Sequence, residues 1–221
     1  MIYVMSDLHG RMDDYLALLD KIGFAEDDVL YVLGDTVDVG ERAMELLTDM
    51  SMRANVYPIA GEHDLLALRM LNGFSNMLKS GAAPDPAFAA EMTEWVRDGG
   101  APTLEGFRAL DDDMREGVLD YLSEFALYEE VEAGGKSFVL AHGGIADFDP
   151  ETPLEDYEPA QFFAPTPAGV AFFPDRTLVV GHEPTQSGRV ERDGGVIRVH
   201  CGTQAGGVGC LCLDNGEEFY V

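Results

Sequence analysis

Acidic and histidine side chains follow short apolar runs at several places in this sequence. The run from Val29 to Leu33 ends at Gly34 and is followed by two acids three residues apart, Asp35 and Asp38. Strands end in this way where the chain turns sharply and presents side chains at the carboxyl edge of a sheet. Four of the five histidines lie in segments of the same form, which are Asp7-Leu8-His9, Gly61-Glu62-His63-Asp64, Ala141-His142-Gly143-Gly144 and Gly181-His182-Glu183.

Carboxylate and imidazole groups at successive strand ends suit a metal centre. Together they bind zinc, manganese or iron, and one carboxylate can bridge two ions. Two ions about 3.5–4 Å apart can hold both the attacking and the leaving oxygens of a phosphoryl displacement. A single Gly-Asp pair more often forms a turn, and a single histidine is more often structural. Four histidines that each lie beside glycine or an acid are hard to explain as core residues, so we predict a metal site.

These side chains need strands and helices to position them. Strands are predicted at residues 1–5, 29–33 and 56–60. Apolar residues at helical spacing predict a helix over 12–22 that ends at Gly23, and a second helix is expected from about residue 42 to 52. Alternating strands and helices indicate α/β layering, in which ligands gather at the carboxyl ends of the strands.

Residues 64–127 are predicted to be mostly helical. Asp85-Pro86 suits the N-cap and first position of one helix, and the acids at 111–113 suit the start of the next. A stripe of four apolar residues is assigned to the core without a chemical role: Phe88, Met92, Trp95 and Val96.

The rest of the chain is predicted to return to strands. These are expected at 128–132, 137–141 and 177–180, the last two leading to His142 and His182. An irregular loop is expected at 145–175, which is rich in proline and acids. The tail is predicted to be a β-meander with hairpin turns at Asp193-Gly194 and Asn215-Gly216. No repeat or linker interrupts the sequence, so we predict one domain over residues 1–221.

Composition restricts the partners. The chain has 41 acidic residues against 14 Lys and Arg, a formal net charge of −27, which repels nucleic acids. A phosphorylated substrate could enter only where cations reverse the local sign. No apolar run is long enough to span a membrane, and the run at 1–5 is too short for a signal peptide, so we expect a cytoplasmic protein. Three cysteines, Cys201, Cys210 and Cys212, form no disulfide framework, and core packing is expected of the last two.

The ordered motifs resemble the calcineurin-like metallophosphoesterases, specifically the serine/threonine phosphoprotein phosphatase branch with its bacterial and diadenosine-tetraphosphatase relatives. That family has Asp-x-His, Gly-Asp-x-x-Asp-Arg-Gly, Gly-Asn-His-Glu, His-Gly-Gly and Gly-His-Thr-Pro in this order. The corresponding segments here are 7–9, 34–40, 61–64, 142–144 and 181–184, with further similarity at 95–103 and 211–221.

The resemblance implies an α/β fold of two mixed β-sheets packed as a sandwich flanked by helices, in four α/β/β/α layers. It implies two divalent metal ions, with manganese favoured and iron or zinc as alternatives, and a metal-bound hydroxide as the nucleophile. By position, Asp7, His9 and His182 would hold the first ion, and Asp35 would bridge both. Glu62 and His142 would hold the second ion. His63 would be the general acid, oriented by Asp38.

The sequence departs from the family at its phosphate-binding positions. Val39 lies where the family has an arginine, Glu62 replaces a neutral asparagine, and the stretch 161–164, Gln-Phe-Phe-Ala, lacks a second arginine. His200 lies where the family commonly has aspartate. Arg42 is the nearest replacement for the lost arginine and is assigned to substrate binding, although a surface role is the more usual one for such a residue.

Three functions follow from these observations. The first is a metal-dependent phosphoesterase acting on a phosphoprotein or a small phosphoester. The second is a phosphodiesterase or dinucleotide polyphosphate hydrolase, because the loss of cations favours a substrate of lower charge. The third is a catalytically weak or inactive metal-binding regulatory relative, although intact His63 and Asp38 argue against it. The motifs do not determine the oligomeric state.

Overall fold

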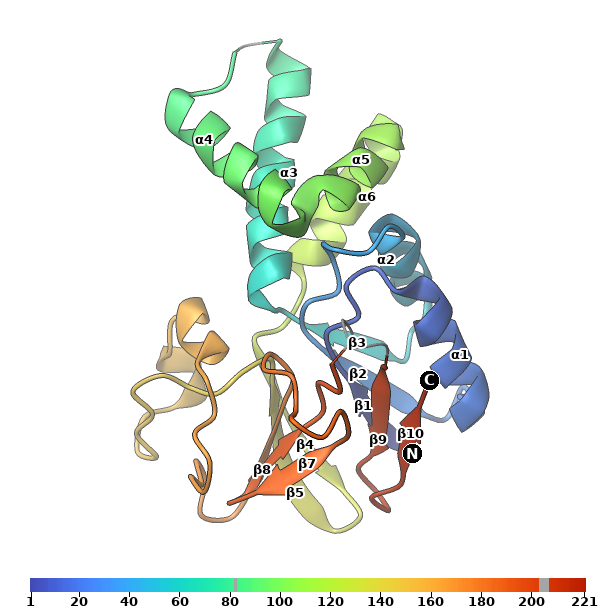
Figure 1. The fold of residues 1–221 in the computed structure, drawn as a ribbon, viewed down its shortest axis with the longest axis vertical. Coiled ribbons are helices and arrows are strands. Elements are labelled where there is room, and N and C mark those ends of the chain that lie inside the picture. Colours follow the sequence, from blue (N-terminus) through green and yellow to red (C-terminus); the bar gives the residue numbers. More distant parts are fainter. Residues whose placement is uncertain (82, 203–206) are drawn as a thin grey trace.

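Two mixed five-stranded sheets form the centre of the protein in the computed structural model, which describes residues 1–81, 83–202 and 207–221 (Figure 1). The first sheet has the order β10 (Glu218–Tyr220), β9 (Gly209–Cys212), β1 (Ile2–Met5), β2 (Val29–Leu33) and β3 (Val56–Ile59). The second has the order β4 (Tyr128–Ala133), β5 (Lys136–Ala141), β6 (Thr177–Val180), β8 (Val196–Arg198) and β7 (Glu191–Asp193). The predicted pair of mixed sheets is therefore confirmed.

The sheets pack face to face because side chains alternate along each strand. On β5, Phe138 and Leu140 point into the interior between the sheets, where they pack with Val4 and Leu33 of the first sheet. Val139, the residue between them, faces the opposite side. Burial of apolar side chains on both faces makes the strands largely apolar runs.

Helices cover the outer face of the first sheet, as predicted. Helix α1 (Met12–Ile22) ends at Gly23, which caps it in the left-handed conformation with φ 64°, and α2 (Ala43–Met52) begins one residue after Arg42. The outer face of the second sheet is covered by the irregular segment at 145–173 with two short 3₁₀ helices, η2 (Leu154–Asp156) and η3 (Pro159–Phe163). Phe162 is fully buried there.

A helical unit rises from the edge of the sheets and forms the upper part of Figure 1. Its members are α3 (Glu62–Ser80), α4 (Pro86–Trp95), the kinked segment η1 (Val96–Gly100), α5 (Ala101–Ala109) and α6 (Asp112–Ser123). Asp85 caps α4 and Asp111 caps α6 through their side chains, as the sequence predicted. Among the described residues, no helix is both long and apolar enough to cross a membrane.

The predicted β-meander of the tail is wrong. Both hairpin turns exist, at Asp193-Gly194 and Asn215-Gly216, but β7 and β8 pair within the second sheet and β9 and β10 within the first. The two hairpins are adjacent along the chain and lie on opposite sides of the sandwich. Cys210 and Cys212 pack in the apolar core beneath α1, which confirms their core role.

Candidate metal centre

The candidate ligands lie where the parallel strands of both sheets end. Strands β1, β2 and β3 deliver three of the predicted segments, and β5 and β6 deliver His142 and His182. The loops that follow these strands hold non-glycine residues with positive φ: Asp7 (53°), His9 (44°), Asp35 (52°) and His182 (61°). Such conformations are unfavourable for these residues and cluster at functional sites.

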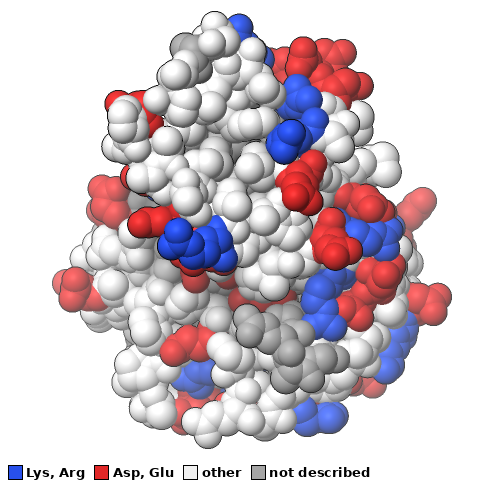
Figure 2. Space-filling view, turned by 45° about the horizontal axis from the view of Figure 1, so that its top comes forward, with Lys and Arg blue, Asp and Glu red and all other residues white. Residues whose placement is uncertain are grey.

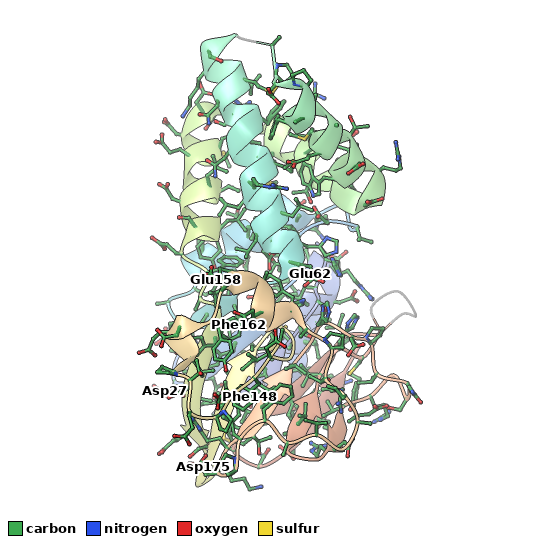
Figure 3. The ribbon with its side chains drawn as sticks, turned by 90° about the vertical axis from the view of Figure 1, so that its left-hand side faces the viewer. Asp27, Glu62, Phe148, Glu158, Phe162 and Asp175 are labelled. Atoms are coloured by element: carbon green, nitrogen blue, oxygen red, sulfur yellow. The ribbon has the colours of Figure 1, made fainter. Side chains whose placement is uncertain are left out.

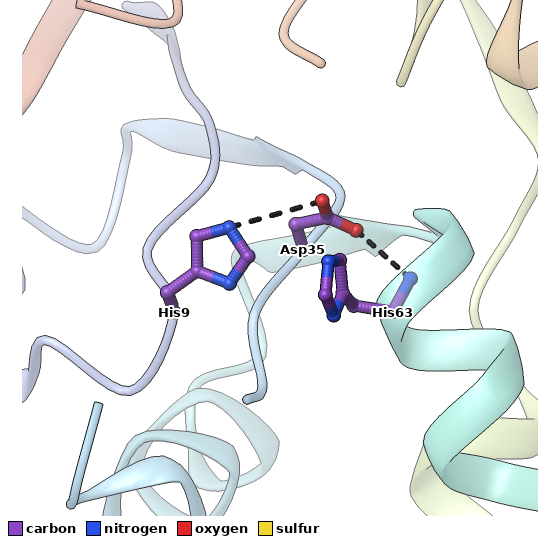
Figure 4. Close-up of side chains that lie close together, drawn as sticks. All are labelled: His9, Asp35 and His63. Carbon is purple, nitrogen blue, oxygen red and sulfur yellow. Dashed lines mark hydrogen bonds and ion pairs between the residues drawn. The ribbon is translucent and has the colours of Figure 1, made fainter. Parts of the chain in front are cut away.

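Asp35 occupies the centre of the cluster and is 3% exposed. One carboxylate oxygen, Oδ2, lies 3.9 Å from Nε2 of His9 and 3.4 Å from Nε2 of His142. The other, Oδ1, accepts a hydrogen bond from the backbone N–H of His63 at 3.1 Å (Figure 4). A carboxylate that faces imidazoles on two sides is suited to bridge two cations.

Glu62 connects the histidines of the second sheet. It is the first residue of α3 and lies at the end of that helix where it meets the sheets (Figure 3). Its Oε2 is 2.8 Å from Nε2 of His142, and its Oε1 is 3.0 Å from Nδ1 of His182. The three side chains thus form one group of close donors that could hold an ion.

Backbone carbonyls set the orientation of two imidazoles. Nδ1 of His9 lies 2.9 Å from the carbonyl of Val37, and Nδ1 of His142 lies 2.8 Å from that of Leu33. Each Nδ1–H donates to its carbonyl, which leaves the lone pair of Nε2 directed into the site.

Buried atoms in the site lack hydrogen-bond donors, which fits a bound cation. Nε2 of His142, Oε2 of Glu62 and Oδ1 of Asp7 are buried without a hydrogen-bond partner among the described residues. A buried acceptor without a partner is costly, and two acceptors in contact require a positive charge between them. The donor set of imidazole and carboxylate suits manganese, iron or zinc.

In the metal-free protein, protons supply part of the positive charge that the buried ligand atoms require. Burial lowers the pKa of His142, but the charges of Asp35 and Glu62 outweigh it and raise that pKa well above 6.5. Burial opposes ionisation of Glu62, but its contacts with His142 and His182 lower its pKa. The hydrogen bond with Glu62 also raises the pKa of His182. The site therefore holds positive charge next to its carboxylates.

His63 and Asp38 form the predicted pair. Nδ1 of His63 lies 2.9 Å from Oδ2 of Asp38, and that contact raises the pKa of His63 to about 9. Asp38 is completely buried, whereas the side chain of His63 is 28% exposed. An imidazole held through Nδ1 with its other face accessible can donate a proton from Nε2 to a bound molecule.

The grouping of the ligands differs from the predicted one in the place of His182. The sequence predicted His182 beside Asp7 and His9, but its Nδ1 contacts Glu62 in the group that includes His142. Its backbone N–H alone contacts Asp7, at 3.2 Å from Oδ2. Both oxygens of Glu62 contact histidines. The assignment of His182 to the first ion stays a prediction.

Sequence reasoning missed three supporting residues. Trp95 was assigned to the core and to the stretch 95–103 that resembles the family, without a chemical role. It is buried, and its indole N–H donates to Oδ2 of Asp38 at 2.9 Å. His200, left without a role, places Nδ1 2.9 Å from the carbonyl of His182 and 3.2 Å from Oδ1 of Asp7. Nothing in the local pattern marks either contact.

Asp64 is the third supporting residue. Its carboxylate accepts hydrogen bonds from the backbone of Gly61 and from both the backbone and the hydroxyl of Thr36. It thereby ties the loop after β2 to the start of α3. Burial, together with the charge of Asp35, raises the pKa of Asp64 to about 6. An acid three residues into a helix is a capping signal that the sequence did display.

The predicted substrate-binding residue lies apart from this cluster. Arg42 pairs with Asp13 and Glu45 on the surface, and its Nε donates to Glu45 at 3.0 Å. Val39 is 48% exposed next to the buried Asp38. In the stretch 161–164, the ring of Phe163 lies edge-on to His142 at 5.9 Å between centroids.

The chain as a whole is acidic, with 41 Asp and Glu against 14 Lys and Arg. Figure 2 shows acidic side chains distributed over the visible face, with basic side chains lying next to them. Attraction of an anion must therefore come from cations held within the site rather than from the surface.

Comparison with known proteins agrees with the geometry. Residues 1–210 match the calcineurin-like phosphoesterase family. A protein named symmetrical bis(5'-nucleosyl)-tetraphosphatase from Yersinia pestis (strain Pestoides F) is 34% identical over 167 residues, which cover 73% of this chain and 46% of the relative. A protein of the same name from Yersinia pseudotuberculosis serotype O:3 (strain YPIII) is 29% identical over 167 residues, which also cover 73% of this chain and 46% of the relative. The chain spans less than half of the length of these relatives.

Solved structures agree on the fold. A putative diadenosine tetraphosphatase has a TM-score of 0.69 and 16% identity, covering 100% of this chain and 92% of the other. A serine/threonine phosphatase from Saccharomyces cerevisiae with similarity to human phosphatase PP5 has a TM-score of 0.58 and 16% identity, covering 100% and 78%. Since the family match extends over almost the whole chain and the ligand segments converge as the motifs require, this protein belongs to the calcineurin-like phosphoesterases.

Proposed function

We propose that this protein hydrolyses a phosphoric ester or anhydride with two divalent cations, for which manganese is the first choice. The observation that carries the proposal is the close approach of two buried ligand atoms, Oε2 of Glu62 and Nε2 of His142, at 2.8 Å, where a proton takes the place of a cation in the metal-free protein. Two ligands of one cation lie at about this separation, because each metal–ligand bond is about 2 Å long. When bound, the cations activate water and neutralise charge on the phosphoryl oxygens.

The residues of the site have two separate roles, which are to hold the cations and to donate a proton. Asp7, His9, Asp35, Glu62, His142 and His182 hold the cations. His63 stands beside them, with its ring 5.0 Å from that of His9. Asp38 holds Nδ1 of His63, so that Nε2 protonates the leaving oxygen.

The charge of the site favours a reacting phosphoryl group of low charge. Two divalent cations against the carboxylates of Asp7, Asp35 and Glu62 leave about one positive charge, and Arg42 is engaged elsewhere. A unit charge about 5 Å away at an effective dielectric near 20 changes the binding free energy by about 3 kcal/mol. A diester or an internal phosphate of a dinucleoside polyphosphate carries one negative charge and suits this balance better than a phosphomonoester dianion.

The names of the relatives support the same class, since they describe dinucleoside tetraphosphates. Activity on phosphoproteins is the second candidate, favoured by the fold shared with serine/threonine phosphatases. A purely regulatory metal-binding role would leave the buried Asp38–His63 pair without a purpose. The cytoplasmic location expected from the sequence stays a prediction.

A substrate panel with manganese tests the proposal. The panel consists of p-nitrophenyl phosphate, bis(p-nitrophenyl) phosphate, diadenosine tetraphosphate and a phosphopeptide. We expect turnover of the diester or the dinucleotide that is abolished in Asp35→Asn and retained in Asp27→Asn, which changes an exposed acid. Turnover that survives in Asp35→Asn would assign the activity to a contaminant, and no turnover of any substrate would contradict the proposal.

A further inference from the structure

Trp95 is the single tryptophan of the chain and is 3% exposed. Its indole Nε1–H donates a hydrogen bond to Oδ2 of Asp38 at 2.9 Å. The same oxygen is paired with Nδ1 of His63 at 2.9 Å, and the other oxygen of Asp38 is buried without a hydrogen-bond partner among the described residues. Two N–H groups from different helices, Trp95 on α4 and His63 on α3, therefore contact the same oxygen of a completely buried carboxylate.

The backbone around Trp95 is shaped to hold this contact. Directly after Trp95, the segment η1 forms a kink between α4 and α5 with non-helical backbone at Asp98 and Gly99 (φ 121°). The carbonyl of Gly99 accepts the N–H of Val39 at 2.8 Å. The ring of Trp95 fills the space over Gly100, where an added Cβ would lie 2.2 Å from the indole. Further along, Thr103 Oγ1 accepts the backbone N–H of Asp38 at 2.8 Å.

We propose that Trp95 is a positioning residue for the proton-donating histidine, acting through Asp38. A carboxylate that accepts a single hydrogen bond can rotate about its Cβ–Cγ bond. The second hydrogen bond, from the indole N–H, fixes the rotation in which Oδ2 contacts His63. The imidazole is thereby held with Nε2 directed at the leaving oxygen, a geometry on which proton transfer depends steeply. This inference rests on the proposed function, in which His63 is the general acid.

A packing role alone makes a different prediction. Trp95 shares its apolar cluster with Phe107, so a substitution of either residue disturbs the same core. Of these two residues, only Trp95 donates a hydrogen bond to Asp38. A purely structural defect would lower the rate for every substrate alike, whereas loss of proton donation would lower it mainly where the leaving group needs a proton.

The test compares leaving groups in the metal-loaded protein. Trp95→Phe keeps most of the ring volume and removes the N–H. We expect kcat for a phenyl ester to fall roughly tenfold, with KM unchanged, while kcat for the p-nitrophenyl ester of the same class stays within about twofold, since p-nitrophenolate leaves without a proton. Phe107→Leu, the matched core variant, is expected to affect both esters equally. Equal losses on both esters in Trp95→Phe, or no loss, would overturn the proposal.

A second measurement separates this inference from the proposed function. NMR of the wild-type protein should show the Nδ1–H resonance of His63 and one tryptophan indole N–H resonance. Trp95→Phe is expected to shift the resonance of His63, and Asp38→Ala to shift the indole resonance, while Phe107→Leu leaves both in place. If no phosphoester is hydrolysed, the proposed function fails, and the positioning role of Trp95 is then tested by these resonances alone. An unmoved His63 resonance in Trp95→Phe would overturn the positioning role.

Discussion

Oε2 of Glu62 lies 2.8 Å from Nε2 of His142, and neither buried atom has a hydrogen bond among the described residues. Because the Nδ1–H of His142 is used by the carbonyl of Leu33, Nε2 of the neutral imidazole is an acceptor, and a proton or a metal cation has to join it to Oε2 of Glu62. Glu62→Gln should lower the affinity for Mn²⁺ by at least about tenfold. Calorimetric titration of the metal-free proteins measures the Mn²⁺ affinity, with Asp27→Asn as the control. Equal affinities of the wild type and Glu62→Gln would show that Glu62 is not a metal ligand.

Metal affinity should rise with pH across the neutral range. The charges of Asp35 and Glu62 keep the pKa of His142 well above 6.5 against the effect of burial, so a proton occupies the ligand atom at neutral pH. A cation has to displace this proton, and raising the pH therefore strengthens binding. Titrations with Mn²⁺ between pH 6 and 9 measure the slope. Glu62→Gln removes one of the charges that hold the proton, so its slope should be shallower; a wild-type affinity that is constant over this range contradicts the prediction.

The pH dependence of turnover should report the Asp38–His63 pair. The hydrogen bond with Asp38 raises the pKa of His63 to about 9, and a general acid works only while protonated. We expect activity to fall above about pH 9 in the wild type. In Asp38→Asn the pKa of His63 moves down toward its ordinary value of 6.5, so the alkaline limb should move to lower pH. The acidic limb serves as the internal control, and an alkaline limb that does not move would show that another group titrates.

Much of the site could be predicted because strand ends are visible in the sequence. Asp7, Asp35 and His142 each follow an apolar run, and parallel strands deliver such residues to one edge. The grouping of His182 could not be predicted in this way. It depends on a contact between distant elements, in which Oε1 of Glu62 at the start of α3 lies 3.0 Å from Nδ1 of His182.

Contacts between distant elements explain the other failures. Trp95 fits an apolar helical stripe, and nothing in that stripe shows that its indole N–H reaches Asp38. The tail hairpins were recognised from their turns, but the sheet that each hairpin joins is set by packing, since β9 pairs with β1 and β8 pairs with β6. The local sequence pattern predicts that a strand forms, but the strand with which it pairs depends on tertiary packing.

A cation restored at position 39 should shift the substrate preference. Val39 is 48% exposed and adopts φ 66°, which is unfavourable for a β-branched side chain. Val39→Arg combined with Glu62→Asn adds positive charge and removes a negative one beside the substrate. Turnover of p-nitrophenyl phosphate at saturating Mn²⁺ should rise by at least about two orders of magnitude, because each of the two charge changes is worth about 3 kcal/mol.

Val39→Met with Glu62→Asn is the matched control for this double variant. Methionine also lacks β-branching, so it relieves the same backbone strain without a charge. We expect it to leave the monoester rate well below that of the arginine variant. Equal rates in the two double variants would show that charge does not determine the preference.

Gly34 allows the loop after β2 to pack against His142. It has φ 78°, and an added Cβ would lie 2.2 Å from Nδ1 of His142 and 2.9 Å from Cα of Gly61. Gly23 also has a positive φ, 64°, but an added Cβ there meets nothing within 4 Å. Alanine at either position should cost about 1–2 kcal/mol of stability because of the left-handed backbone. Gly34→Ala should in addition displace His142 and weaken Mn²⁺ binding, which Gly23→Ala should leave intact. Chemical denaturation and metal titration of both variants separate strain from displacement, and normal metal affinity in Gly34→Ala would show that the imidazole is not held by this contact.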